Sequence, residues 1–113
     1  MQKIYRLTQR GSFAYAYRKG DSVATARLVV YKVPARRLKV GFSVGKKVGN
    51  SVVRSRVKRG ISERFRRLIP QIKPEYNFVV IARSACADAS SDQINKDLLY
   101  ALKKHGVLIE VEC

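Results

Sequence analysis

Basic side chains gather in one segment of this 113-residue chain, and their types suit the binding of phosphate. Arginine can hold a phosphate through two parallel hydrogen bonds, and lysine adds a compact positive charge. Residues 46–67 contain nine Lys or Arg and one acidic residue, Glu63. A solvated charged surface is the alternative, but this imbalance favours contact with a nucleic acid. The basic residues are Lys46, Lys47, Arg54, Arg56, Lys58, Arg59, Arg64, Arg66 and Arg67.

The charge of the whole chain also indicates a polyanionic partner. The formal net charge is +16, whereas a small soluble domain needs only roughly 2–8 units. Residues 1–70 hold 19 basic and two acidic residues, and residues 71–113 hold five basic and six acidic ones. An anionic membrane is a weaker candidate, because no basic amphipathic helix with exposed Trp, Phe or Leu is evident. Nucleic acid is therefore the expected partner, and no membrane association is expected.

The sequence offers no set of residues for catalysis by the protein itself. The single histidine, His105, has no paired nucleophile, and we expect it to be solvated and to stabilise the end of a helix. Cys86 is expected to be an inert, small side chain. Three aspartates are interpreted as loop and helix residues rather than as metal ligands. They are Asp88, Asp92 and Asp97. No catalytic residue and no metal ligand are expected in the protein.

The length and the cysteine content set the expected organisation and compartment. One nucleic-acid-binding domain is expected over residues 1–113, because this length supplies one modest core and no linker is visible. Two cysteines, Cys86 and Cys113, form neither a disulfide framework nor a metal cluster. The first ten residues lack an apolar stretch of the kind found in secretion signals. A cytoplasmic location is therefore expected.

The basic segment requires a helix to present it. Residues 51–69 are predicted to be helical, with Asn50 or Ser51 as the N-cap and Pro70 at the end. Apolar side chains recur with helical spacing along one side, and arginines project from the opposite side. The apolar side holds Val53, Val57, Ile61, Phe65 and Leu68, and the basic side holds Arg56, Arg59 and Arg66.

The other elements predict an α+β sandwich, with helices packed on one small sheet. A first helix is expected from Thr8 to about Lys19, and residues 23–33 read as one strand. A short link at Pro34 predicts antiparallel pairing of that strand with residues 38–44. Residues 77–83 form an apolar central strand. Ser90 and Gln93 predict a capping box for a third helix that ends at Gly106, and residues 107–111 are a candidate last strand.

The segment KKVGNSVVRSRVKR, residues 46–59, resembles the signature of bacterial ribonuclease P proteins. That signature has an Arg-Asn-Arg core followed by a hydrophobic residue, Lys and Arg. Ser55 stands in the place of the asparagine, so this position keeps a hydrogen-bonding group but lacks the amide. The resemblance extends over roughly residues 5–105. It includes Phe13, Tyr17, Gly20, Val30-Tyr31, the strand VGFSV at 40–44 and FVVIAR at 78–83.

The resemblance implies a protein that assists a catalytic RNA. In this family the RNA removes the 5′ leader of precursor tRNA, with Mg²⁺ bound mainly by the RNA. The implied partners are that catalytic RNA and precursor tRNA, with no obligate protein partner. The implied fold is ribosomal-protein-like, a mixed or antiparallel sheet with about three helices and a left-handed βαβ crossover. The implied contacts to the catalytic RNA are Lys46, Lys47, Asn50, Arg54, Ser55, Arg56, Lys58 and Arg59.

Three aromatic residues match the family's cleft for the single-stranded leader: Phe13, Tyr17 and Tyr31. Single strands are held by aromatic stacking beside positive charge, which supports this interpretation. The alternative is that all three belong to the core. A second class of function also stays open, a ribosomal protein or ribosome-assembly factor of the same fold. A protein that binds duplex DNA is less favoured, because neither a helix-turn-helix nor a zinc-ligand spacing is present.

Overall fold

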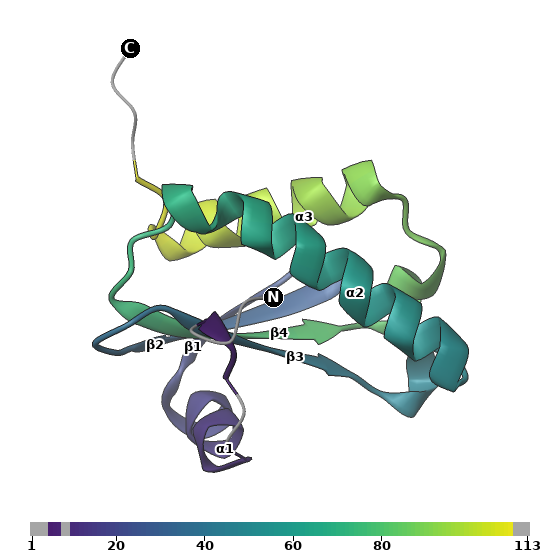
Figure 1. The fold of residues 1–113 in the computed structure, drawn as a ribbon, viewed down its shortest axis with the longest axis horizontal. Helices are drawn as coiled ribbons and strands as arrows, with labels where there is room; N and C mark the ends of the chain where they lie inside the picture. The colour runs from purple at the N-terminus through teal and green to yellow at the C-terminus, as the bar shows by residue number, and fades with distance from the viewer. Residues whose placement is uncertain (1–4, 8–9, 110–113) are drawn as a thin grey trace.

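A four-stranded mixed sheet lies at the centre of the fold, in the strand order β1-β2-β4-β3 (Figure 1). The computed structural model describes residues 5–7 and 10–109. The strands are β1 (Asp21–Ala24), β2 (Leu28–Pro34), β3 (Lys39–Val44) and β4 (Tyr76–Ala82). The helices are α1 (Arg10–Lys19), α2 (Ser51–Leu68) and α3 (Ser91–His105). Helix α1 lies on one face of the sheet, and α2 and α3 cover the other. The predicted α+β sandwich is confirmed.

The single strand predicted over residues 23–33 is wrong, because the chain reverses within it. Strands β1 and β2 pair as an antiparallel hairpin around Thr25. The hydroxyl of Thr25 accepts hydrogen bonds from the backbone amides of Leu28 at 2.9 Å and Arg27 at 3.3 Å. The Thr25 amide itself donates to the Leu28 carbonyl at 2.7 Å. These local bonds satisfy the backbone in a turn, so the β-rich composition does not continue as one strand.

The predicted pairing of residues 23–33 with residues 38–44 is also wrong. Strand β4 lies between β2 and β3, antiparallel to β2 and parallel to β3. Three consecutive residues of β4 are fully buried, so this strand gains most from the central position. They are Phe78, Val79 and Val80. The segments β3, α2 and β4 form the β–α–β unit to which the family resemblance assigns the left-handed crossover.

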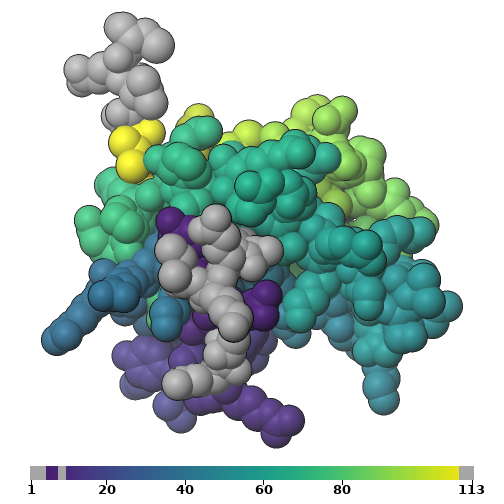
Figure 2. All heavy atoms as spheres, in the orientation of Figure 1, coloured from purple at the N-terminus to yellow at the C-terminus, as the bar shows by residue number. Residues whose placement is uncertain are grey.

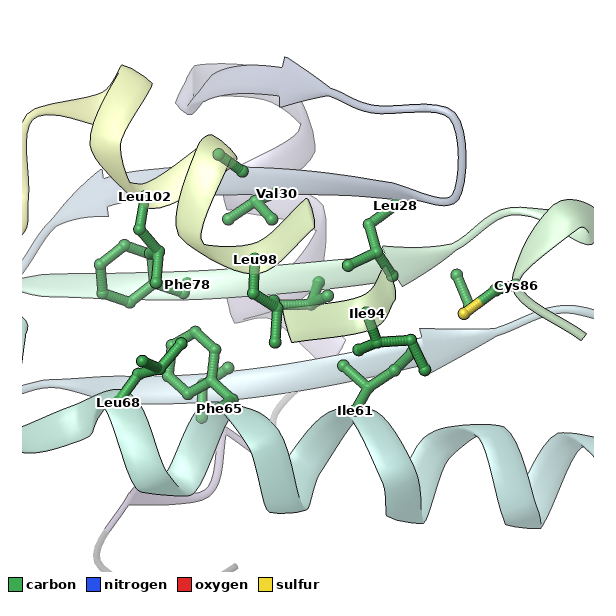
Figure 3. Close-up of a cluster of buried hydrophobic side chains, with 14 of the residues drawn as sticks. Leu28, Val30, Ile61, Phe65, Leu68, Phe78, Cys86, Ile94, Leu98 and Leu102 are labelled. Carbon is green, nitrogen blue, oxygen red and sulfur yellow. The ribbon is translucent and has the colours of Figure 1, made fainter. Parts of the chain in front are cut away.

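Two hydrophobic cores hold the helices to the sheet. The larger lies between the sheet and helices α2 and α3, where Phe65, Phe78 and Leu98 are buried (Figure 3). The smaller lies beneath α1 and contains Ala16 and Val79. Neighbouring residues of one strand point into opposite cores, as the two-residue period of a β-strand requires. The sheet thus fixes α1 and α2 on opposite faces.

The helix ends agree with the sequence signals. The side chain of Asn50 accepts a hydrogen bond from the Val53 amide at 3.0 Å, which settles the N-cap of α2. Ser90 and Gln93 form the predicted capping box, and Gly106 ends α3 with a φ of 71°. The last strand is limited in the described chain to one bridge between Leu108 and Ile72. The predicted Thr8 cap and residues 110–111 lie outside the described residues.

The prediction that His105 is solvated is wrong. Its side chain is buried against β2, and the ring Nε2 lies 2.8 Å from the Val30 carbonyl oxygen. Lys32 donates a hydrogen bond to the His105 carbonyl at 3.1 Å, so the positive charge of Lys32 lies close to the ring. Loss of solvent lowers the pKa of His105, and Lys32 adds to this, while the Val30 bond and Asp21 oppose it. The neutral ring donates its Nε2 proton to Val30.

The buried ring predicts a fall in stability at mildly acidic pH. Below the ordinary histidine pKa of 6.5 the unfolded chain takes up a proton that the folded chain resists, so the free energy of unfolding decreases as pH falls. The stability is fully present above pH 6.5 and is lost toward the lower folded pKa. His105→Gln retains a donor for Val30 and removes this titration. Urea unfolding at about pH 7.5 and about pH 5.5 measures the effect, and an equal pH dependence in both proteins would contradict it.

Candidate nucleic-acid interface

A short turn places two exposed lysines at the start of α2. The 3-10 turn η2 (Lys46–Val48) is anchored by the buried side chain of Val48, while Lys46 and Lys47 are exposed. Gly49 then lies close to α2, since a Cβ atom at this position would be 2.8 Å from Val53 Cγ1. The basic turn is therefore held tightly against the first turn of the helix.

Helix α2 separates apolar from basic side chains as its periodicity predicts. Val57, Ile61, Phe65 and Leu68 are buried, and Val53 is half-buried. The opposite side exposes Ser55, Arg56, Lys58 and Arg59 to solvent. Arg54 differs from them because it is half-buried, and its Nε atom has no hydrogen-bond partner in the described part of the chain. In the space-filling view, α2 forms a broad part of the visible surface (Figure 2).

The single acidic residue of α2 is paired with two arginines in the C-terminal half of the helix. Glu63 accepts a hydrogen bond from Arg66 and lies 3.7 Å from the Nε atom of Arg67. The hydrogen bond from Arg66, with the charges of both arginines, lowers the pKa of the Glu63 carboxyl. Within the described chain no carboxylate forms an ion pair with Arg56 or Arg59. The uncompensated charge therefore lies on the N-terminal half of α2.

The three predicted cleft aromatics lie on the α1 face of the sheet, and two of them are in ring contact. The rings of Tyr17 and Tyr31 stand edge to face, with their centroids 5.3 Å apart. Tyr17 is 43% exposed, whereas Phe13 and Tyr31 are half-buried and contact the small core beneath α1. Phe13 and Tyr31 therefore belong partly to the core, whereas Tyr17 lies at the open surface. Tyr17 presents the most accessible ring.

Sequence reasoning missed a groove that runs beside β3, between α1 and α2. Its volume is about 610 Å³, and Phe13, Gly41, Phe42 and Ser62 contribute to its lining, together with basic residues of α2. The tip of the Phe13 ring rests on Gly41, where a Cβ atom would lie 2.3 Å from its Cζ atom. Tyr17 and Tyr31 do not line this groove. Segments far apart in the sequence form it, so no single motif could have revealed it.

The described residues offer no protein metal centre. Within residues 5–7 and 10–109, no three His, Cys, Asp or Glu side chains come together in a way that could hold a metal ion. Asp97 forms an ion pair with Arg27 at 3.3 Å. Cys86 is buried, and burial, with the nearby Asp97, raises the pKa of its thiol. Magnesium therefore finds no matching set of protein ligands in this part of the chain.

None of the helices in the described ranges is long and apolar enough to cross a membrane.

Comparison with known proteins links the chain to one family. The ribonuclease P family model matches residues 1–106. The ribonuclease P protein component of Oceanobacillus iheyensis is 41% identical over 96% of this chain and 92% of its own length. That of Listeria innocua is 38% identical over 96% and 93%. The solved RNase P protein of Staphylococcus aureus has a TM-score of 0.83 and 36% identity, covering 92% of this chain and 97% of its own. The RNase P protein of Thermotoga maritima has a TM-score of 0.79 and 27% identity, covering 88% and 96%.

The fold and its basic helix, taken with these relatives, define an RNA-binding α+β protein that serves in tRNA processing. The sequence and structural relatives named above are all ribonuclease P proteins. The chain belongs to the bacterial ribonuclease P protein family, and it is a subunit of that ribonucleoprotein endonuclease, with the ribonuclease P RNA as its partner. Family membership decides against the ribosomal alternative, which charge and helix pattern alone left open.

Proposed function

We propose that the chain binds the ribonuclease P RNA through η2 and the N-terminal half of α2. The uncompensated charge of Arg56, Lys58 and Arg59 is the observation that carries this proposal. Charges that repel one another within a helix become favourable when phosphates neutralise them. Lys46, Lys47, Asn50, Arg54 and Ser55 complete the contact surface. Ser55 is exposed and can donate a hydrogen bond to phosphate, although it lacks the amide of the family's asparagine.

The 5′ leader of precursor tRNA is proposed to contact the other face of the sheet, at Phe13, Tyr17 and Tyr31. The accessible ring of Tyr17, held edge to face by Tyr31, supports this assignment. An aromatic ring stacks on any base, so such a surface suits leaders of different sequence. The leader and the catalytic RNA would then occupy different surfaces of one RNA-binding domain, residues 1–113. Mg²⁺ is proposed to be bound mainly by the RNA subunit. A cytoplasmic location without an obligate protein partner remains part of the proposal.

Precursor tRNA should not be cleaved by the protein in the absence of its RNA subunit. The described chain presents no paired nucleophile and base, and its one histidine is buried against a backbone carbonyl. The measurement is incubation of nuclease-treated, RNA-free protein with precursor tRNA and Mg²⁺. Addition of the ribonuclease P RNA should restore cleavage at the mature 5′ end. Specific cleavage by RNA-free protein would refute the proposed division of labour.

A further inference from the structure

We propose that Gly41 is a positioning residue for leader binding, because the absence of a side chain there fixes where the ring of Phe13 lies. This inference rests on the proposed contact between Phe13 and the leader, and it adds a residue of β3 that acts through the ring. The tip of the ring occupies the space that a side chain at position 41 would need. A Cβ atom at this position would lie 2.3 Å from Phe13 Cζ, 2.7 Å from Cε1 and 3.1 Å from Cε2.

The backbone of β3 does not itself require a glycine at position 41. Gly41 lies within the strand, in register with Val79 of β4, and its φ is not positive. Any residue adopts such an extended conformation. A glycine inside a strand loses more conformational entropy on folding than other residues and offers no side chain to pack. The physical reason for glycine here is therefore the close approach of the Phe13 ring.

The other six glycines of the chain do not make room for a ring. Four of them have open space where a Cβ atom would be, with no atom within 4 Å: Gly11, Gly45, Gly60 and Gly106. The nearest atoms to a Cβ atom at Gly20 and Gly49 belong to residues four positions away along the chain. In the described structure, only Gly41 would bring a Cβ atom against an aromatic ring of another element. This close approach is specific to Gly41 and Phe13.

Gly41 also stands in one row with a leader tyrosine. It pairs with Val79 of β4, and Val79 pairs with Tyr31 of β2. Adjacent strands are about 4.8 Å apart, so Gly41 lies about 10 Å across the sheet from Tyr31. Phe13 fills the empty end of this row, and the Tyr17–Tyr31 pair stands at the other end. A side chain at position 41 would therefore move Phe13 relative to the two tyrosines.

The ring that Gly41 positions is accessible to a base. Phe13 is half-buried, and it lines the groove beside β3 together with Gly41. It also contacts the small core beneath α1. A ring that served only the core would be buried completely, whereas this ring is held firmly and still borders open space. A ring with so little freedom loses little entropy when a base stacks on it.

The test adds one methyl group where the tip of the ring lies. Holoenzyme is reconstituted from the ribonuclease P RNA and each protein variant, and its affinities for long-leader precursor tRNA and mature tRNA are measured. Gly41→Ala should lower the ratio of these affinities about fivefold or more, and Phe13→Leu should do the same. The matched control is Gly60→Ala, the same change where no atom lies within 4 Å. It should leave the ratio unchanged.

A double variant separates positioning of the ring from a general effect on the fold. Leucine lacks the Cε and Cζ atoms that a Cβ atom at position 41 would meet. In the Phe13→Leu background, Gly41→Ala should therefore cause no further fall in the ratio. The melting temperature of the double variant should also exceed that of Gly41→Ala alone, because the steric conflict is gone. This variant tests the inference even where Gly41→Ala alone folds poorly.

Each possible result bears on the role of Gly41. A lower ratio with Gly41→Ala, absent with Gly60→Ala and not deepened in the Phe13→Leu background, supports the inference. An unchanged ratio with Gly41→Ala, beside a lower ratio with Phe13→Leu, would overturn the inference alone. An equal further loss in the Phe13→Leu background would also overturn it, since Gly41 would then act without the ring. If Phe13→Leu leaves the ratio unchanged, the proposed leader contact of Phe13 falls first, and this inference falls with it.

Discussion

Simultaneous replacement of Arg56 and Arg59 by glutamate should weaken binding to the catalytic RNA by about 100-fold or more. Each charge-assisted hydrogen bond to phosphate is worth roughly 1.5–3 kcal/mol, and the new carboxylates add repulsion. The plot of log K against log salt should become less steep by roughly 0.7–0.9 for each phosphate that the variant no longer neutralises. Both side chains are exposed, so the buried face of α2 should keep the helix in place. Binding measured over a range of salt concentrations tests the prediction.

The control for this variant is an equal change of charge elsewhere. Lys103 and Lys104 are exposed near the end of α3, and their replacement by glutamate gives the same net charge. If specific contacts at α2 matter, the α3 variant should keep most of the affinity and a nearly unchanged salt slope. Equal losses in the two variants would mean that only the total charge of the protein counts. Unchanged affinity of the α2 variant would mean that its basic side is merely solvated.

Tyr17→Ala and Tyr31→Ala should each weaken the binding of precursor tRNA to the holoenzyme while leaving mature tRNA unaffected. A stacked base is worth roughly 1–3 kcal/mol, which corresponds to about fivefold to 150-fold in affinity. Mature tRNA has no leader and so cannot use these rings. Assembly with the catalytic RNA should persist, because α2 is on the opposite face of the sheet. The ratio of the two affinities, measured with a long leader, tests the prediction.

Tyr15→Ala is the matched control for the tyrosine pair. Tyr15 is also on α1 and is 49% exposed, but it forms no ring contact with Tyr31 in the described structure. Its loss should leave the ratio unchanged. Tyr17→Ala and Tyr31→Ala could instead weaken the binding of precursor and mature tRNA equally, or only lower the melting temperature. Either result would mean that the two rings stabilise the fold and do not bind the leader. Phe13→Ala is less informative, because this ring also contacts the small core.

The features predictable from sequence were those decided by near neighbours along the chain. The Asn50 cap, the Ser90–Gln93 capping box and the stop at Gly106 depend on residues three or four positions apart. The basic surface of α2 was predictable for the same reason, since helical periodicity alone separates Arg56 from Val57. The family resemblance supplied the roles of these residues, which periodicity could not.

The features that escaped prediction depend on distant pairing. The short β2–β3 link suggested direct pairing, but the insertion of β4 is decided by the apolar content of a segment more than thirty residues away. The burial of His105 likewise depends on where α3 meets the Val30 carbonyl of β2. The groove combines α1, β3 and α2, and its ring position depends on Gly41. The position of β4, the burial of His105 and the groove all depend on contacts that exist only once the sheet has assembled.

The central place of β4 also determines when the sheet can close during synthesis. Strands β2 and β3 are each bonded to β4, but β4 comes last of the four in the sequence, at Tyr76–Ala82. Until the ribosome has released that segment, the earlier strands have only the β1–β2 hairpin to form. A two-stranded hairpin alone is barely stable in water. The part of the chain that precedes β4 carries nearly all of the positive charge. Its sheet therefore stays largely unfolded until β4 has been synthesised.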